Sequence, residues 1–278
     1  MPSGKRLEVH GAAELRYVLK QGQTGIEHLY VRDPMKFLFP RSEAGEPPTA
    51  VVVTTAGGIV GGDRLDLDIA VGDGAEALVT AQAAEKAYGS LGPDCSIEVA
   101  VTAGQNAWLE WLPQETILFE NARLRRRTRL DLADDSQAMA GEILVFGRVA
   151  RGEVMTRGLV RDAWEIRRDG RLVWADALHL DGDLTKPLCH PAGFAGERAC
   201  ATAVYAAPGA ETRLDEARDI LADPDGVCAG VTAFPGLLVA RFLAPDPYAL
   251  RRVYAGYWAG IRHHLGARPK RMPRLWYV

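Results

Sequence analysis

The stretch AGGIVGGDRLDLDIAVGDG, residues 56–74, has a glycine spacing close to that of a ligand-binding loop. A glycine-rich loop after an apolar strand binds phosphate when a helix follows, because the helix N-terminus presents free N–H groups. Here residues 65–71 alternate between apolar and polar or small side chains, which predicts a strand instead. Asp63-Arg64 also stands where a P-loop needs Lys-Ser/Thr. We therefore expect a tight connection between two strands, with close backbone approach at its glycines. These are Gly57, Gly58, Gly61 and Gly62.

Carboxylates are the second kind of residue that could do chemistry. Asp63 directly follows the Gly61-Gly62 pair, where it could cap a turn through backbone N–H groups or project into a site. Together with Glu110 it could form the acid–base pair of a carboxylate-dependent β-fold enzyme acting on a polar substrate, if the fold brings the two together. Asp66 alternates with apolar neighbours, so we expect it on a solvated strand face.

The sequence shows no recognisable nucleophile or tight metal site. No G-x-S-x-G occurs, and the four cysteines form no C-x-x-C pair. His263 and His264 are adjacent, so they would point to different faces of a helix. Cys189-His190, with Cys200 further on, matches no zinc spacing and indicates a buried thiol near a turn. We expect no catalytic residue and no tightly bound cofactor.

The segment RLRRRTR, residues 123–129, places alternate arginines on one side of an expected strand. These arginines could form a solvated face or protect a sheet edge, since charged side chains blunt exposed edges. They could instead form a docking stripe for an acidic partner, because arginine is enriched at interfaces. The members are Arg123, Arg125, Arg127 and Arg129.

The elements that would position these residues are mainly β-strands. Residues 67–77 resemble residues 97–107, and each segment has a strand, a glycine-containing turn and a second strand. A weaker third copy starts at residue 129. Such strand–turn–strand units predict stacked, layered β-sheets. Further strands are expected at residues 51–55, 142–146, 163–168, 172–180, 227–234 and 237–242, with a hairpin at Asp169-Gly170.

Helices are few in this prediction. One is expected at residues 212–222, and a clearer one begins at Asp246-Pro247, where a capping residue precedes a proline of the first turn. Its apolar residues recur every three or four positions until Gly266. We expect a single domain over residues 1–278, with a β body to about residue 244 and a C-terminal helix and tail over 245–278.

Composition narrows the class of protein. The 278 residues are 47% apolar, which is enough for a large core. Lysines and arginines number 33 against 36 acidic residues, so the chain lacks the basic excess of a nucleic-acid binder. The N-terminus has no apolar signal segment, and no run reaches the length of a membrane span. We expect a cytoplasmic protein that binds neither nucleic acid nor membrane.

Four segments in order carry a family resemblance. They are GGIVGGDRLDLDIAVGDGAEALVTAQAAEKAYGS, AWLEWLPQETILFENA, EILVFGRVARGE and the terminal PRLW. Together they resemble the signature of the UreD/UreH family of urease accessory proteins. The motif loop of this resemblance consists of Gly57, Gly58, Gly61, Gly62 and Lys86. The chain departs from the common pattern at Glu85, where threonine is frequent.

The resemblance implies a non-enzymatic maturation role. Members of this family are mainly β and bind a helical UreF-type protein, which recruits a UreG-type GTPase. The assembly acts on apo-urease and helps to install its nickel centre, and a UreE-type protein can supply the nickel indirectly. The chain would then be a scaffold, with or without Ni²⁺ passing through it.

The same resemblance suggests which residues to examine. A conduit should hold transient Ni²⁺ weakly, through scattered oxygen ligands, because tight binding would trap the ion. Asp63 and Glu142 are the expected transit ligands. The C-terminal helix and tail are expected to contact the partner, because aromatic residues are enriched in interface cores. The aromatic candidates are Tyr254, Tyr257, Trp258 and Trp276.

Overall fold

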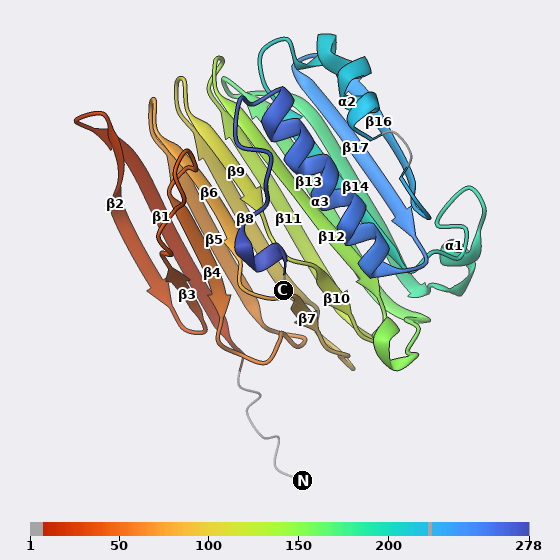
Figure 1. The fold of residues 1–278 in the computed structure, drawn as a ribbon. Coiled ribbons are helices and arrows are strands. Elements are labelled where there is room, and N and C mark those ends of the chain that lie inside the picture. Colours follow the sequence, from red (N-terminus) through yellow and green to blue (C-terminus); the bar gives the residue numbers. More distant parts are fainter. Residues whose placement is uncertain (1–7, 222–223, 278) are drawn as a thin grey trace.

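The structure is a computed structural model that describes residues 8–221 and 224–277, and it consists of two stacked β-sheets with its longest helix across the outer face of one of them (Figure 1). The first sheet has seven strands. In spatial order they are β14 (Arg171–Asp183), β13 (Arg157–Arg168), β11 (Arg123–Leu132), β8 (Cys95–Ala103), β5 (Arg64–Val71), β1 (His10–Lys20) and β2 (Gln23–Arg32). The mainly β, layered architecture expected from the repeats is confirmed.

The second sheet has ten strands. Eight follow one another in space as β16 (Cys228–Phe234), β17 (Leu237–Ala244), β15 (Ala199–Ala206), β12 (Gln137–Phe146), β9 (Trp108–Leu112), β6 (Glu76–Ala81), β4 (Thr49–Thr54) and β3 (Met35–Leu38). Two short strands extend it, since β10 (Thr116–Leu118) pairs in parallel with both β12 and β7 (Glu85–Ala87).

The repeated segments form neighbouring parallel strands in both sheets. β5, β8 and β11 pair in parallel in one sheet, and the strands that follow them, β6, β9 and β12, pair in parallel in the other. Leu67 pairs with Val99, two residues beyond the Ile97 with which the sequence similarity aligns it. A shift of two keeps the same face toward the core, because side chains alternate along a strand.

The helices are α1 (Thr185–Cys189), α2 (Leu214–Ile220) and α3 (Pro247–His264), with 3₁₀ turns η1 (Val149–Arg151), η2 (Ala210–Arg213) and η3 (Arg274–Trp276). The Asp246 side chain accepts a hydrogen bond from the Tyr248 N–H, which caps α3 as expected. The helix predicted at 212–222 begins as η2 and continues as α2, and Ala222 lies outside the described residues.

The core has two layers. One fills the space between the sheets, and the other lies between the ten-stranded sheet and α3, which crosses the outer face of that sheet (Figure 1). The outer face of the seven-stranded sheet carries alternate charged residues instead, as the exposure pattern of β11 shows. The sandwich interior is therefore closed by sheets on both sides, and polar residues inside it need internal partners.

Candidate functional site

A cavity of about 210 Å³ lies between the two sheets. Its lining includes Glu85 of β7, Arg126 of β11 and Glu142 of β12, among apolar side chains from both sheets. The exposed residues Gly57 and Gln82 also belong to this lining, so the cavity meets the surface between the glycine loop and the segment that precedes β7. The arrangement is an internal polar space with an opening to solvent.

A buried ion cluster forms one wall of the cavity. Arg126 donates to both oxygens of Asp162, from Nε at 2.9 Å and from Nη2 at 2.6 Å, and its Nη2 also bonds to Glu142 Oε2. Its Nη1 donates to Thr116 Oγ1 at 3.0 Å. Trp164 Nε1 donates to the second Glu142 oxygen at 2.7 Å. One guanidinium thus serves two carboxylates that are at most 8% exposed.

The electrostatics of this cluster follow from its burial. Burial raises the pKa of Glu142 well above its usual value, while Arg126 acts in the opposite direction. Burial would lower the pKa of Arg126, but Asp162 and Glu142 outweigh this effect and raise it. Arg126 therefore stays charged, whereas ionisation of Glu142 is disfavoured in this environment.

Glu85 supplies the second carboxylate of the cavity. Thr54 Oγ1 donates to it at 2.9 Å, and the Lys86 N–H donates at 3.2 Å. Burial raises its pKa as well. Lys86 itself has an exposed side chain, although it also belongs to the cavity lining. Glu85 and Glu142 thus offer oxygen ligands from two different strands of the ten-stranded sheet.

The glycine loop packs directly against the segment around β7. The Ile59 N–H bonds to the Lys86 carbonyl at 2.8 Å, and a Cβ on Gly58 would lie 2.5 Å from the same oxygen. Gly58 and Gly62 have φ of 144° and 96°, values that favour glycine. A Cβ on Gly61 would lie 2.1 Å from the Pro93 carbonyl oxygen. The loop leads into strand β5, so the close approach expected from the sequence is present.

Asp63 lies at the end of this loop, and its carboxylate bonds to backbone groups. The Val9 N–H donates to Oδ1 at 3.0 Å and the Val60 N–H donates to Oδ2 at 2.9 Å. Its side chain is buried, and it is not part of the cavity lining. This is the turn-capping arrangement, so of the two expected transit ligands the structure brings only Glu142 to the cavity.

Glu110 lies in the other core layer, on the α3 side of β9. It accepts hydrogen bonds from Trp258 Nε1 at 2.9 Å and from Arg262 Nη2 at 2.8 Å, and it is fully buried. Asp63 in the loop before β5 and Glu110 beneath α3 therefore have separate partners, and the structure does not unite them as an acid–base pair. Across residues 8–221 and 224–277, no group of three or more His, Cys, Asp or Glu side chains is placed to hold a metal ion.

The four C-terminal aromatic residues are buried within this chain. Their exposed fractions are 6% or less, and Tyr254 stacks on Trp276 with ring centroids 5.7 Å apart. In this conformation they form the core beneath α3 instead of an exposed surface. The exposed aromatic residues of the C-terminal helix and tail are Tyr248 and Tyr277, which are 74% and 70% exposed. A partner contact of the helix and tail remains a prediction, and these tyrosines are the side chains available for it.

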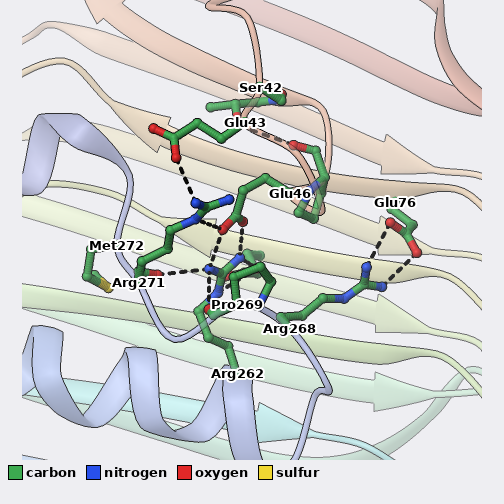
Figure 2. A network of polar contacts seen from close by, with 12 residues as sticks. Ser42, Glu43, Glu46, Glu76, Arg262, Arg268, Pro269, Arg271 and Met272 are labelled. Atoms are coloured by element: carbon green, nitrogen blue, oxygen red, sulfur yellow. Dashed lines mark hydrogen bonds and ion pairs between the residues drawn. The ribbon is translucent and has the colours of Figure 1, made fainter.

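The basic tail is held down by carboxylates of its own chain (Figure 2). Arg262 is 1% exposed and bonds to Glu46 as well as to Glu110. Arg268 pairs with Glu76 at 2.7 Å, and Arg271 pairs with Glu46 at 2.7 Å. These contacts fasten the tail across the ten-stranded sheet.

A surface groove runs between α3 and this tail. Its lining includes Tyr248, Arg252 and Tyr277, together with Gln82 and Gln114, which also line the inter-sheet cavity. The opening of the cavity therefore lies next to the exposed face of the C-terminal helix. The expected transit residue Glu142 and the expected partner-contacting helix thus belong to neighbouring parts of the molecule.

The arginine stripe lies on the exposed face of β11, flanked by β8 and β13. Of the two solvated alternatives, edge protection does not apply, because pairing on both sides places β11 inside the sheet. The solvated face is confirmed, and ion pairs link Arg123 and Arg125 to Asp94 and Arg127 to Glu165. The arginines already have acidic neighbours, and a docking role for them remains untested.

The prediction of a buried thiol near a turn is also wrong for Cys189. Its side chain is exposed at the end of α1, and the adjacent His190 Nδ1 accepts a hydrogen bond from the Ala192 N–H. Cys200 lies on β15 near Glu142, and burial raises the pKa of its thiol. The two cysteines belong to different surroundings.

Sequence reasoning missed Arg126, Asp162 and Glu85. A signal was available for the first two. In β11 the inward-facing series is Leu124, Arg126, Thr128 and Leu130, and in β13 it is Val160, Asp162, Trp164 and Ile166. A single charge at an inward position needs a partner, and these two charges are opposite in sign.

The fold and the cavity describe a layered β scaffold with a polar interior. Comparison with known proteins gives its family. The family model described as "UreD urease accessory protein" matches residues 9–277. The chain is 47% identical over 276 residues to the urease accessory protein UreD of Magnetococcus marinus, covering 97% of this chain and 94% of the relative. It is 45% identical over 257 residues to UreD 1 of Methylobacterium radiotolerans, covering 92% and 86%.

The chain belongs to the UreD family of urease accessory proteins. A third relative, UreD of Azorhizobium caulinodans, is 42% identical over 255 residues, with 92% of this chain and 91% of the relative covered. This membership supports an accessory role in urease maturation, and the family expected from the four sequence segments is confirmed. No helix in the described part of the chain is both long and apolar enough to cross a bilayer.

Proposed function

We propose that this protein is a non-enzymatic scaffold that helps to install nickel in apo-urease, and that its inter-sheet cavity is part of the path of Ni²⁺. The observation that carries this proposal is the cavity itself, which has Glu85 and Glu142 in its lining and opens beside α3. Ni²⁺ is the cargo here and needs only brief contacts. Two separated carboxylates with water suit such contacts, because a complete ligand set would hold the ion too tightly.

The chemistry of the two carboxylates supports transit. Each accepts hydrogen bonds from neutral donors, Thr54 for Glu85 and Trp164 for Glu142, which keep the side chains in place. Burial disfavours their ionised forms. A cation entering the cavity would offset that penalty, because an opposite charge nearby favours the ionised carboxylate. Asp63 remains a proposed ligand, but it would first have to release the two backbone N–H groups that it binds.

The proposed partners follow from the family. The scaffold would bind a UreF-type protein, which links it to a UreG-type GTPase, and would act on apo-urease in the cytoplasm. A UreE-type protein would supply nickel indirectly. GTP hydrolysis would take place in the GTPase partner, and this chain would contribute no catalytic residue. The groove beside α3 is the proposed contact for the UreF-type protein, since it adjoins the opening of the cavity.

The test is activation of nickel-free urease by the purified partner set with GTP and Ni²⁺, with and without this chain. We expect activation to require the chain. Equal activation without it would reject the maturation role. Activation that requires the chain but is unaffected by Glu85→Gln and Glu142→Gln would leave a structural adaptor without metal transit. Glu98→Gln is the matched control, because Glu98 is exposed on β8.

A further inference from the structure

Arg126 occupies the position from which a cation in the cavity would reach the buried carboxylates. It is part of the cavity lining, whereas Asp162 is not, so the guanidinium separates Asp162 from the cavity. It also bonds to one of the two Glu142 oxygens, and Trp164 bonds to the other. Every oxygen of the two carboxylates therefore already has a donor.

We propose that Arg126 is a resident competing cation, which prevents the Glu142–Asp162 pair from trapping a divalent ion in the cavity. The identity of the cargo rests on the proposed function. The competition itself rests on the geometry of the cluster. A divalent ion at Glu142 Oε2 competes with the Arg126 Nη2 group for that oxygen, and it approaches Asp162 from the cavity only past the guanidinium that binds both Asp162 oxygens.

The side-chain type suits this role. Arginine remains protonated in proteins, and its planar fork matches the two oxygens of a carboxylate. Arg126 Nη1 donates a hydrogen bond to the hydroxyl of Thr116, a residue that is only 3% exposed. Hydrogen bonds that involve a charged group are stronger than neutral ones. The guanidinium is thus anchored to three strands, and an ion that binds nearby faces a permanent competitor.

The consequence of removing Arg126 is specific. Two carboxylates, Glu142 from the ten-stranded sheet and Asp162 from the seven-stranded sheet, would then face one buried space without a counter-charge. Such an arrangement either takes up a proton or binds a cation, because two close carboxylates do not both ionise unaided. Added Ni²⁺ would fill that position and remain there. The variant should therefore bind the ion better and deliver it worse.

The first experiment measures Ni²⁺ affinity of the full-length chain at neutral pH, by competition with a chromophoric chelator. We expect Arg126→Gln to bind Ni²⁺ about tenfold or more tightly than the wild type, the equivalent of one charged hydrogen bond no longer competing. Arg126→Lys retains a cation and should show a much smaller gain. Glu142→Gln in the Arg126→Gln background should remove the gain. Folding of each variant is checked by circular dichroism.

If Arg126→Gln does not fold, a charge-balanced double variant tests the same proposal. Arg126→Gln combined with Asp162→Asn removes one charge of each sign, and its reference is Asp162→Asn alone. Tighter Ni²⁺ binding by the double variant than by that reference supports the proposal. Folded variants that bind Ni²⁺ no more tightly than their references would overturn it and leave Arg126 a purely structural residue.

The activation assay separates this inference from the proposed function. If both hold, Arg126→Gln should increase Ni²⁺ affinity while it reduces delivery to urease. A merely structural role would leave affinity unchanged while activation falls. If affinity rises but urease activation never requires the wild-type chain, the competing-cation role of Arg126 stands and the transit function fails.

Discussion

Arg126 and Asp162 are paired positions of the neighbouring parallel strands β11 and β13, and their side chains form a doubly hydrogen-bonded ion pair inside the sandwich. Strand register alone therefore brings the two charges together. The outward-facing arginines of β11 form surface ion pairs, so alternate residues of one strand serve an exposed face and a buried cluster.

Removal of the Asp162 charge should destabilise the fold strongly. Asp162→Ala leaves Arg126 with Glu142 as its single remaining carboxylate partner, and breaking a buried ion pair costs about 3–5 kcal/mol. The free energy of unfolding from urea titration measures this loss. Glu165→Ala is the control, since it removes the half-exposed partner of Arg127 and should cost about 1 kcal/mol or less. Equal losses in the two variants would contradict the assigned importance of the buried pair.

Alanine substitutions at two neighbouring glycines of the loop should have very different effects on stability. Gly58→Ala would force a Cβ to within 2.5 Å of the Lys86 carbonyl at a φ of 144°. Backbone strain of this kind costs about 1–3 kcal/mol. Gly57→Ala meets no atom within 4 Å and should change stability by about 0.5 kcal/mol or less. Urea unfolding of both variants tests the contrast, which fails if Gly57→Ala is as costly as Gly58→Ala.

Acid should weaken the surface cluster around Asp94. Partial burial would raise the pKa of Asp94, but hydrogen bonds from Arg125 and Arg123 outweigh it and lower the pKa below its usual value of 3.8. The folded state then binds the proton less readily than the unfolded chain. The stabilisation is therefore complete above pH 3.8 and is lost as the pH falls through the lower, folded-state pKa.

Asp94→Asn tests this dependence. The variant should lose stability relative to the wild type at neutral pH, and the difference should shrink in strong acid. Thermal unfolding across this pH range measures the difference between the two proteins. A difference that stays constant with pH would mean that the carboxylate charge of Asp94 is not responsible.

Two substitutions in the C-terminal helix and tail should distinguish residues that stabilise the fold from residues that bind a partner. Trp276 is 6% exposed, stacks on Tyr254 and lies beneath the Arg251 guanidinium, whose carbon is 4.4 Å from its ring centroid. Trp276→Ala should therefore cost about 3–5 kcal/mol of folding stability. Tyr248→Ala changes an exposed side chain of the groove and should leave stability unchanged.

Co-purification with the UreF-type protein provides the matching measurement. We expect Tyr248→Ala to weaken it, because Tyr248 is available to a partner whereas Trp276 is not. Truncation after Gly266 should abolish it, since this removes both Tyr277 and the arginines that fasten the tail. Undiminished recovery of the partner by folded Tyr248→Ala, together with retained binding by the truncated chain, would place the contact elsewhere.

Local patterns were enough to predict much of the fold. Alternation in residues 65–71 predicted β5, the Asp169-Gly170 pair predicted the hairpin of β13 and β14, and capping by Asp246 predicted the start of α3. Each of these features depends on neighbours in the chain, since alternation, positive φ and caps are properties of a few consecutive residues.

The candidate site could be predicted only in part. Glu142 was identified, but its partners Arg126 and Asp162 come from different strands and meet through sheet register. Asp63 was expected to reach a functional site, and its carboxylate instead binds the N–H groups of Val9 and Val60. The sequence does not show which of its alternative hydrogen-bond partners a carboxylate will meet.

Residue types and their order thus specified the family, the strands, the glycine loop and the C-terminal helix. The stacking of the sheets decided which side chains are buried and which charged groups meet. It turned Tyr254, Tyr257 and Trp258 of α3 inward, kept Asp63 and Glu110 apart, and gathered Arg126, Glu142 and Asp162 into one buried cluster beside the cavity. The physical reason is that secondary structure depends on short-range backbone preferences, whereas burial and charge pairing depend on which distant segments come to lie side by side.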